Sequence, residues 1–160
     1  MTIAAAIRPK NTSVTFTLNS SGTGASQTII AEGSPHIINV DATRRVGGKD
    51  EYPSPLSYAL SSLISCSQVT AQLVANDLGI KLNSFEFDLK ANLDTTILFE
   101  GAEEGNPNFQ NIIIKARIET NTSDELFEKL KIETERRCPV YQLFSRSGVH
   151  IRSQWVRQAS

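Results

Sequence analysis

The sequence predicts an α+β fold in which antiparallel sheets pack on a long central helix and a second helix. Two stretches, residues 55–78 and 122–137, repeat apolar side chains with the helical period. Several short stretches instead alternate apolar and polar side chains, as strands with one solvent-exposed face do. Strands precede, separate and follow the helices at hairpin-like spacings, which favours antiparallel pairing over a doubly wound parallel sheet.

The central helix is predicted over residues 55–78. Ser54 suits its N-cap, Pro55 its first turn, and Gly79 the left-handed position just past its end. Its apolar stripe consists of Leu56, Leu60, Leu63, Val74 and Leu78. No charged residue occurs from residue 53 to residue 75, although a solvent-exposed helix face normally carries Lys and Glu. We therefore expect the helix to be covered on most sides, and a second subunit, giving a homodimer, is the economical cover.

The strands are predicted from the alternation of their side chains. They comprise residues 13–19, 27–31, 36–40, 85–91, 95–99, 112–118 and 149–155. Residues 19–26, which contain Gly22 and Gly24, are expected to form a turn between the first two. The sequence has neither internal repeats nor low-complexity tracts, so residues 1–160 are expected to form a single domain.

The second helix is predicted to start with a capping box, formed by Thr122 with Glu125 three residues on. It ends at the pair Cys138-Pro139, because the residue before a proline avoids the helical region. Pro139 then suits the start of a short helix over residues 140–144, with Cys138 at its N-cap.

Composition excludes several classes of partner. The chain has 160 residues and a formal net charge of -1, which argues against nucleic acid or an anionic membrane as the main partner. Residues 1–7 are apolar, but they lack a basic n-region and are too short for a signal peptide. Since no apolar run approaches the ~20 residues of a membrane span, we expect a cytoplasmic protein.

Cys66 and Cys138 are the only cysteines, and His36 and His150 the only histidines. Two thiols in a reducing compartment do not form a disulfide framework. No spacing among the four residues fits a zinc site, so neither a metal nor another cofactor is expected. The residues themselves leave two interpretations open. The thiols are inert core side chains, or they form a reactive pair.

The two thiols are expected to differ in their surroundings. Cys66 lies in the middle of the central helix, on the flank of its apolar stripe, and is expected to be shielded from bulk reductant. Cys138 lies at a helix N-terminus, whose dipole stabilises a thiolate, and follows Arg136 and Arg137.

Three segments carry a family likeness. In INVDATRRVGGKDEYPSPLSYALSSLISC, residues 38–66, a Gly-Gly loop leads to a Pro and a helix ending in Cys. In ELFEKLKIETERRCPVYQLF, residues 125–144, a capped helix ends in Cys-Pro. The strand NPNFQNIIIKARIET, residues 106–120, lies between them. In this order and spacing the segments, within residues 37–144, resemble the OsmC/Ohr family of osmotically inducible and organic hydroperoxide resistance proteins.

The resemblance implies a two-layer α+β fold and an intertwined homodimer with active sites at the subunit interface. It also implies a thiol peroxidase that acts on organic hydroperoxides. By motif position, Cys66 corresponds to the peroxidatic thiol and Cys138 to the resolving thiol. In such chemistry a thiolate attacks the O–O bond and becomes a sulfenic acid, which condenses with the second thiol to a disulfide. A dithiol reductant then reduces that disulfide.

Two charged residues of the organic hydroperoxide resistance members are missing. Where those members have a Glu after the helix-opening Pro, this chain has Leu56 and Ser57, and residues 19–22 replace their hairpin-turn Arg with Asn-Ser-Ser-Gly. An unassisted thiol in an apolar helix has a raised pKa and reacts slowly. The connecting loop offers three candidate replacements, Arg44, Arg45 and Glu51.

Two functions therefore stay open. The first is a thiol-dependent peroxidase that takes a hydroperoxide substrate and a dithiol reductant, and the retained cysteine pair favours it. The second is a non-enzymatic dimeric module that binds an apolar small molecule at the subunit interface, and the missing Arg and Glu favour it.

Overall fold

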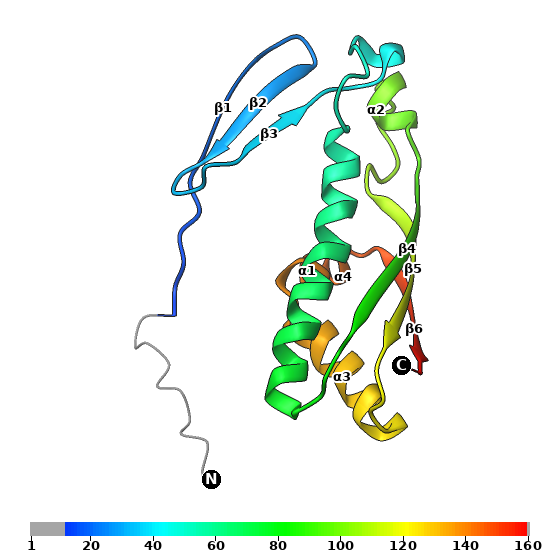
Figure 1. Ribbon diagram of the computed structural model, residues 1–160. Helices are drawn as coiled ribbons and strands as arrows, with labels where there is room; N and C mark the ends of the chain where they lie inside the picture. Colours follow the sequence, from blue (N-terminus) through cyan, green and yellow to red (C-terminus); the bar gives the residue numbers. More distant parts are fainter. Residues whose placement is uncertain (1–11, 160) are drawn as a thin grey trace. The chain divides into compact units, whose positions relative to one another are not determined.

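The computed structural model describes residues 12–159 (Figure 1). Its elements, in chain order, are β1 (Leu18–Thr23), β2 (Ser26–Ala31), β3 (Ile37–Val40), the 3₁₀ helix η1 (Arg44–Val46), α1 (Pro55–Leu78), β4 (Ser84–Leu93), α2 (Thr96–Glu100), β5 (Phe109–Glu119), α3 (Asp124–Arg137), α4 (Pro139–Arg146) and β6 (His150–Gln158). They fall into two compact units, one ending at Ser57 and one beginning at Tyr58. The apolar start, residues 1–7, lies outside the described residues, and the single domain over 1–160 stays a prediction.

The N-terminal unit contains a three-stranded antiparallel sheet in the order β1-β2-β3. The prediction of a strand over residues 13–19 followed by a turn over 19–26 was wrong. The hairpin turn is shorter and later, because Thr23 pairs with Ser26 and only two residues connect them. Gly24 takes the positive φ of 62° that such a turn requires. β1 is polar over most of its length because all six of its residues are exposed, so its sequence carries no alternation.

A buried carboxylate organises the loop that follows β3. Asp41 is fully buried and accepts hydrogen bonds from the Ser26 hydroxyl at 2.7 Å and from the backbone N–H groups of Ala42, Lys49 and Glu51 at 2.8, 3.0 and 3.1 Å. These bonds hold the pKa of Asp41 well below its usual range. One carboxylate thus ties β2 to both ends of the loop.

The C-terminal unit contains the sheet β4-β5-β6. β4 and β5 are antiparallel, as predicted, but β5 and β6 are parallel, with Ile112 opposite Ile151. The prediction of purely antiparallel sheets was therefore wrong for β6. α3 and α4 form a crossover between β5 and β6, which returns the chain to the end where β5 began, and such a crossover produces a parallel pair. The fold is thus α+β with one antiparallel and one mixed sheet.

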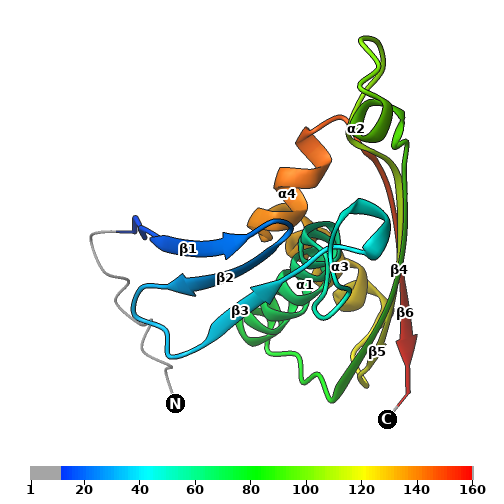
Figure 2. The ribbon, with the colours of Figure 1, turned by 90° about the horizontal axis from the view of Figure 1, so that it is seen from above.

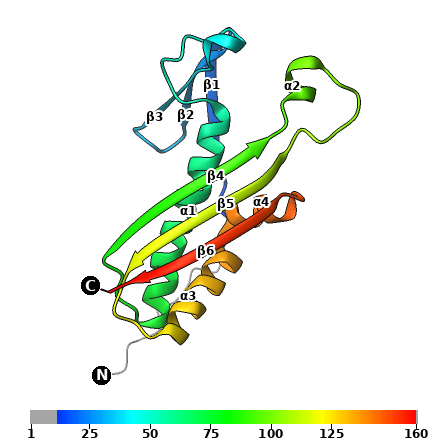
Figure 3. The same cartoon turned by 90° about the vertical axis from the view of Figure 1, so that its right-hand side faces the viewer.

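All the long helices of this unit lie on one face of its sheet (Figures 2 and 3). α1 has the predicted bounds, since the Ser54 hydroxyl accepts the N–H of Ser57 at 3.2 Å and Gly79 ends the helix with φ 69°. One side of α1 packs against α3 and the sheet. The larger of the two core clusters is formed by Val74, Ala75, Ile80, Ala116, Ile118, Phe127 and Leu130, and the smaller by Leu63, Ile112, Ile114 and Val149.

The other side of α1 is exposed in this single chain. Val69 and Leu73 are 62% and 54% exposed, with the exposed Gln68 and Gln72 beside them. The expectation that most sides of the helix are covered is thus not met by the chain alone. An uncharged and partly apolar helix face is left open to solvent.

Two further boundaries differ from the predictions. Residues 95–99 were expected to form a strand, but the short helix α2 forms there because the Asp94 carboxylate accepts both the N–H and the hydroxyl of Thr96, at 2.9 and 2.6 Å. The N-cap of α3 is Ser123 and not Thr122, since the Ser123 hydroxyl accepts the N–H of Leu126 at 3.3 Å. Among the described residues, no helix is long and apolar enough to span a membrane.

Candidate functional site: two thiols at the N-terminus of α4

Cys66 lies in the middle of α1, and its side chain is partly exposed. The backbone N–H groups of its own helix are used inside the helix, so donors for the sulfur have to come from elsewhere. Two groups supply them, the hydroxyl of Thr70 one turn further along α1 and the backbone N–H of Val140 in α4. The Cys66 thiol also interacts with the thiol of Cys138. The structure therefore brings the two predicted site residues together.

Cys138 is the N-cap of α4, as predicted, and its side chain is fully buried. Its Sγ accepts the backbone N–H of Tyr141 at 3.4 Å. It also lies 3.9 Å from the Ser67 hydroxyl oxygen. Ser67 donates its only hydroxyl proton to the carbonyl oxygen of Leu63 at 2.7 Å, so the contact with Cys138 is a hydrogen bond only if the thiol donates.

The N-terminus of α4 serves both sulfurs. Pro139 occupies the first helical position and has no N–H to offer. The next two residues supply one N–H each, Val140 to Cys66 and Tyr141 to Cys138. The positive end of the helix dipole lies at the same place and favours negative charge on either sulfur. The Cys-Pro pair that interrupts the preceding helix is thus what creates the donor end facing Cys66.

Burial raises the pKa of the Cys66 thiol above its ordinary value. The hydrogen bonds from Val140 and Thr70 act in the opposite direction, and the neighbouring Cys138 adds to the rise. Burial is the largest contribution, so the net shift is upward. Cys66 is therefore mainly a thiol at neutral pH, and the two donors limit the penalty for forming the thiolate.

The two arginines before Cys138 do not supply the positive charge expected from the sequence. Arg136 pairs with Glu133 at 2.6 Å, and Arg137 pairs with Asp77 of α1, also at 2.6 Å. Each guanidinium is thus already bound to a carboxylate. The exposure of the sulfurs is also the reverse of the expectation, because in this chain Cys66 is the partly exposed one and Cys138 the buried one.

Residues that the sequence reasoning missed surround the pair. Thr70 and Ser67 are both buried. Thr70 lies one helical turn after Cys66 and Ser67 directly follows it, so helical spacing could have identified both residues. Glu135 lies three residues before Cys138, and its Oε1 is buried without a hydrogen-bond partner among residues 12–159. Burial, together with the nearby negative charge of Glu135, raises the pKa of Tyr141 to about 12. The surroundings of Cys138 are therefore poorly hydrated.

Arg44, Arg45 and Glu51 belong to the N-terminal unit, and their proposed role beside the thiols stays a prediction. The first two lie in η1, and the backbone N–H of Glu51 binds Asp41. Within the described part of the chain, no group of three or more His, Cys, Asp or Glu side chains is placed to hold a metal ion.

A shallow apolar depression lies on the exposed side of α1. Its volume is about 290 Å³. It is lined by Gln68, Val69, Gln72, Leu73 and Phe85. Every residue that lines it is uncharged, which suits an apolar neighbour better than a charged ligand.

Several solved structures share this fold. The chain is similar to the OsmC like protein from Mycoplasma pneumoniae, with a TM-score of 0.73 and 19% identity over 90% of this chain and 97% of that chain. It is similar to the organic hydroperoxide resistance protein OsmC from Legionella pneumophila, with a TM-score of 0.67 and 19% identity over 89% and 96%. For the organic hydroperoxide resistance protein OhrB of Bacillus subtilis the TM-score is 0.58 and the identity 14%, over 89% and 98%. At these identities the likeness shows the fold alone.

Sequence comparison adds the family. No curated protein sequence matches the chain. The family model described as OsmC-like protein matches residues 48–154, which is more than half of the chain and includes α1, β4, β5, the Cys-Pro pair and the first part of β6. The chain therefore belongs to the OsmC-like protein family.

Proposed function

We propose that this chain is a thiol-dependent peroxidase that reduces organic hydroperoxides, with Cys66 as the peroxidatic and Cys138 as the resolving thiol. One observation carries the proposal. Two cysteines 72 positions apart in the sequence interact at the N-terminus of α4, where each sulfur receives one backbone N–H. Structurally inert thiols need neither each other nor these donors. Similar folds described as organic hydroperoxide resistance proteins support the choice of substrate.

The reaction begins when Cys66 loses its proton and the thiolate attacks one oxygen of the peroxide bond. The O–O bond breaks, the sulfur is oxidised to a sulfenic acid, and the other oxygen leaves as an alkoxide that takes a proton to become an alcohol. The N–H of Val140 and the hydroxyl of Thr70 stabilise the attacking thiolate. These two donors take the place that charged groups hold in better-equipped members of the family.

Resolution follows at the same helix end. The Cys138 sulfur attacks the sulfenic sulfur of Cys66, the S–O bond breaks, and the hydroxide that leaves takes up the thiol proton to form water. The product is a disulfide between residues 66 and 138. A dithiol reductant reduces it by two thiol–disulfide exchanges and is itself oxidised. The reducing cytoplasm is the location that this cycle fits.

The active form is a homodimer in this proposal. The exposed, uncharged face of α1 around Val69 and Leu73 needs a cover. Obligate interfaces bury about 2,000 Å² or more and resemble a core cut in half. Light scattering at micromolar concentration should give twice the mass of the chain, whereas a monomeric mass would contradict the dimer.

A second candidate function is a non-enzymatic dimeric module that binds an apolar small molecule at the subunit interface. The depression of about 290 Å³ on α1 favours it, because its lining is uncharged. The raised pKa of Cys66 also favours it, since a thiol is a poor nucleophile.

Consumption of cumene hydroperoxide in the presence of dithiothreitol decides between the two. The peroxidase should consume many equivalents per chain, above the rate of dithiothreitol alone. Cys66→Ser is the matched control, because it removes one sulfur atom and leaves the α4 donors in place. Consumption no faster than in this control would favour the binding module.

A further inference from the structure

The solvent-facing side of the β4-β5-β6 sheet separates its charges along the strands. Strand register aligns five rows of side chains across the sheet on this face. From one end, the rows are Asn92–Asn111–His150, Lys90–Ile113–Arg152, Asp88–Lys115–Gln154, Glu86–Arg117–Val156 and Ser84–Glu119–Gln158. All the acidic side chains in these rows belong to the last three.

The two carboxylates nearest the first two rows are paired with a cation. Arg117 donates to Glu86 at 2.8 Å and to Asp88 at 2.6 Å. This pairing lowers the pKa of Asp88 and raises that of Arg117. Lys115 adds its attraction to Asp88. Glu86 and Asp88 are therefore engaged with a cation of β5. Glu119 accepts the Ser84 hydroxyl at 2.9 Å and lies in the row farthest from the first two.

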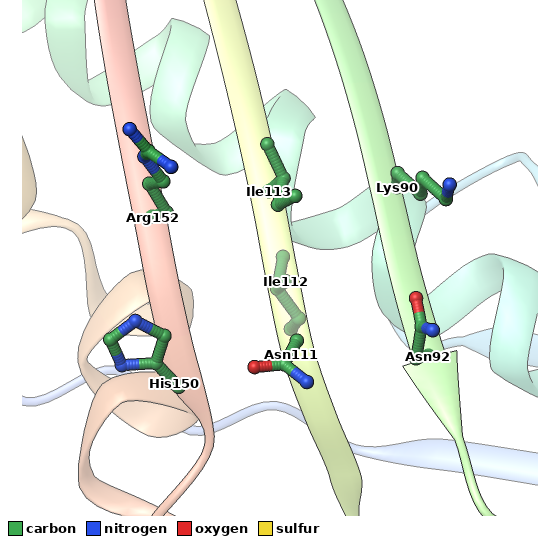
Figure 4. A pocket seen from close by; sticks show the side chains of 7 residues that line it. All are labelled: Lys90, Asn92, Asn111, Ile112, Ile113, His150 and Arg152. Carbon is green, nitrogen blue, oxygen red and sulfur yellow. The ribbon is translucent and has the colours of Figure 1, made fainter.

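The first two rows hold a depression lined by unpaired basic groups. Its volume is about 380 Å³. Its lining consists of Lys90, Asn92, Asn111, Ile112, Ile113, His150 and Arg152 (Figure 4). Within residues 12–159, neither Lys90 nor Arg152 forms an ion pair with a carboxylate. Two full positive charges and one histidine thus lie in one depression without a counter-charge.

The lining side chains come from three neighbouring strands. Lys90 and Arg152 flank Ile113 in one row, and Asn92 and His150 flank Asn111 in the next (Figure 4). Two strand spacings separate the flanking strands, about 10 Å in all, and both long side chains can reach toward the middle. Ile113, 44% exposed, forms an apolar floor between them.

We propose that this depression binds a small molecule that carries a phosphate monoester. A doubly charged oxyanion matches the two unpaired cations, and it has acceptor oxygens for the Arg152 fork and the two Asn amides. The apolar floor accommodates the carbon skeleton of the ligand. The volume lies in the range of small-molecule sites, and the overall net charge of -1 gives no wider basic surface for a polymer.

The proposed site is separate from the thiols. α1, α3 and α4 lie on the other face of this sheet (Figure 3), so Cys66 and Cys138 are across the sheet from the depression. Binding of the phosphate therefore needs neither thiol, and this inference stands or falls independently of the peroxidase.

Titration with phenyl phosphate at constant ionic strength, followed by amide chemical shifts of the isotope-labelled full chain, tests the proposal. The shifts should concentrate on residues 90–92, 111–113 and 150–152 and saturate. The same residues should respond in the Cys66→Ser chain. Benzenesulfonate, which has a similar shape and a single charge, should bind more weakly. Shifts that are absent, spread over the surface or equal for both compounds would overturn the proposal.

Three variants make the test specific. Lys90→Gln and Arg152→Gln should each weaken phenyl phosphate binding by roughly threefold to tenfold, because each removes one exposed charge from the site. Lys129→Gln removes the same charge from α3, and its affinity should equal that of the unchanged chain. Equal losses in all three variants would mean that net charge alone attracts the anion and that no site exists. Unchanged affinity in Lys90→Gln and Arg152→Gln would equally rule out the site.

Discussion

The middle of α1 and the N-terminus of α4 each hold one cysteine and stabilise its sulfur by different means. At α4, Cys138 receives an N–H from its own helix, because the first N–H groups of any helix have no partner inside it. In the middle of α1 no such groups are available, and Cys66 depends on Thr70 and on Val140 from α4. Cys66 is partly exposed and Cys138 is buried.

This difference in exposure is consistent with the proposed roles. A peroxide can reach only a sulfur that solvent reaches, so Cys66 is placed for the first attack. Cys138 is buried, which suits a group that acts only after Cys66 has been oxidised. The comparison also shows what limits the reactivity of Cys66. Its sulfur has hydrogen-bond donors, but no cation is among the main groups within residues 12–159 that lower its pKa.

Removing each sulfur should give the largest effects and should separate the two roles. Cys66→Ser should abolish hydroperoxide consumption, because no other thiol is exposed to start the reaction. Cys138→Ser should allow one equivalent to be consumed and then stop, with a sulfenic acid trapped on Cys66. A dimedone-type probe followed by mass spectrometry detects that acid. If Cys138→Ser instead abolished the first turnover as well, the assignment would be reversed.

The pH dependence of the first step should be steep. Because the Cys66 pKa is raised from a reference of 9.0, the thiolate fraction is small at neutral pH and grows as pH increases. The rate should increase about tenfold per pH unit over the whole range below that pKa. Stopped-flow rates with cumene hydroperoxide, using Cys138→Ser to isolate this step, give the profile. A plateau already present near neutral pH would show that some cation lowers the pKa, with Arg44 and Arg45 the first to test.

Removing the Thr70 hydroxyl should have a smaller effect in the same direction. Thr70→Val keeps the shape of this buried side chain and removes its hydrogen bond to Cys66, which raises the thiol pKa further. At neutral pH we expect a roughly tenfold slower first step, the equivalent of one pKa unit. The rate should recover at high pH, where the thiolate forms in either protein. Thr70→Ser keeps the hydroxyl and should react at nearly the original rate, so equal losses in both variants would indicate a packing defect.

Much of the fold was predictable because local chemistry decides it. The bounds of α1 follow from Ser54, Pro55 and Gly79, whose preferences act within one turn of the helix. The N-cap role of Cys138 follows from the proline after it. β4 and β5 keep a strict alternation because one face packs on the core and the other meets solvent.

Three parts of the fold were missed, β6, β1 and α2, each for a different physical reason. β6 alternates equally well whether its partner is parallel or antiparallel, so its sequence does not reveal its direction. β1 is exposed on both faces, and hydrophobic alternation is therefore not required of it. The apolar run of residues 97–99 suggested a strand. The helix α2 forms there instead because a single side chain, that of Asp94, accepts hydrogen bonds at its start.

The resemblance to the OsmC/Ohr family pointed to Cys66 and Cys138 as a pair, and the two thiols interact in the structure, while their redox roles stay a prediction. The hydrogen-bond donors of the pair were missed. The N–H of Val140 could not be found, since it acts across the gap between two helices far apart in the chain. Arg136 and Arg137 were expected to stabilise a Cys138 thiolate because they precede it in the sequence. In the structure both guanidinium groups bind carboxylates instead.

The central claim is that the two thiols of one chain act as a redox pair with Cys66 first. Its most direct test is to add one equivalent of cumene hydroperoxide to the reduced protein and follow intact mass and peptide maps under non-reducing conditions. Both thiols should disappear together, and a disulfide should join Cys66 to Cys138 within a single chain. If both thiols persist, if Cys138 is oxidised first, or if that disulfide never forms, the assigned roles are wrong and the binding module becomes the better account.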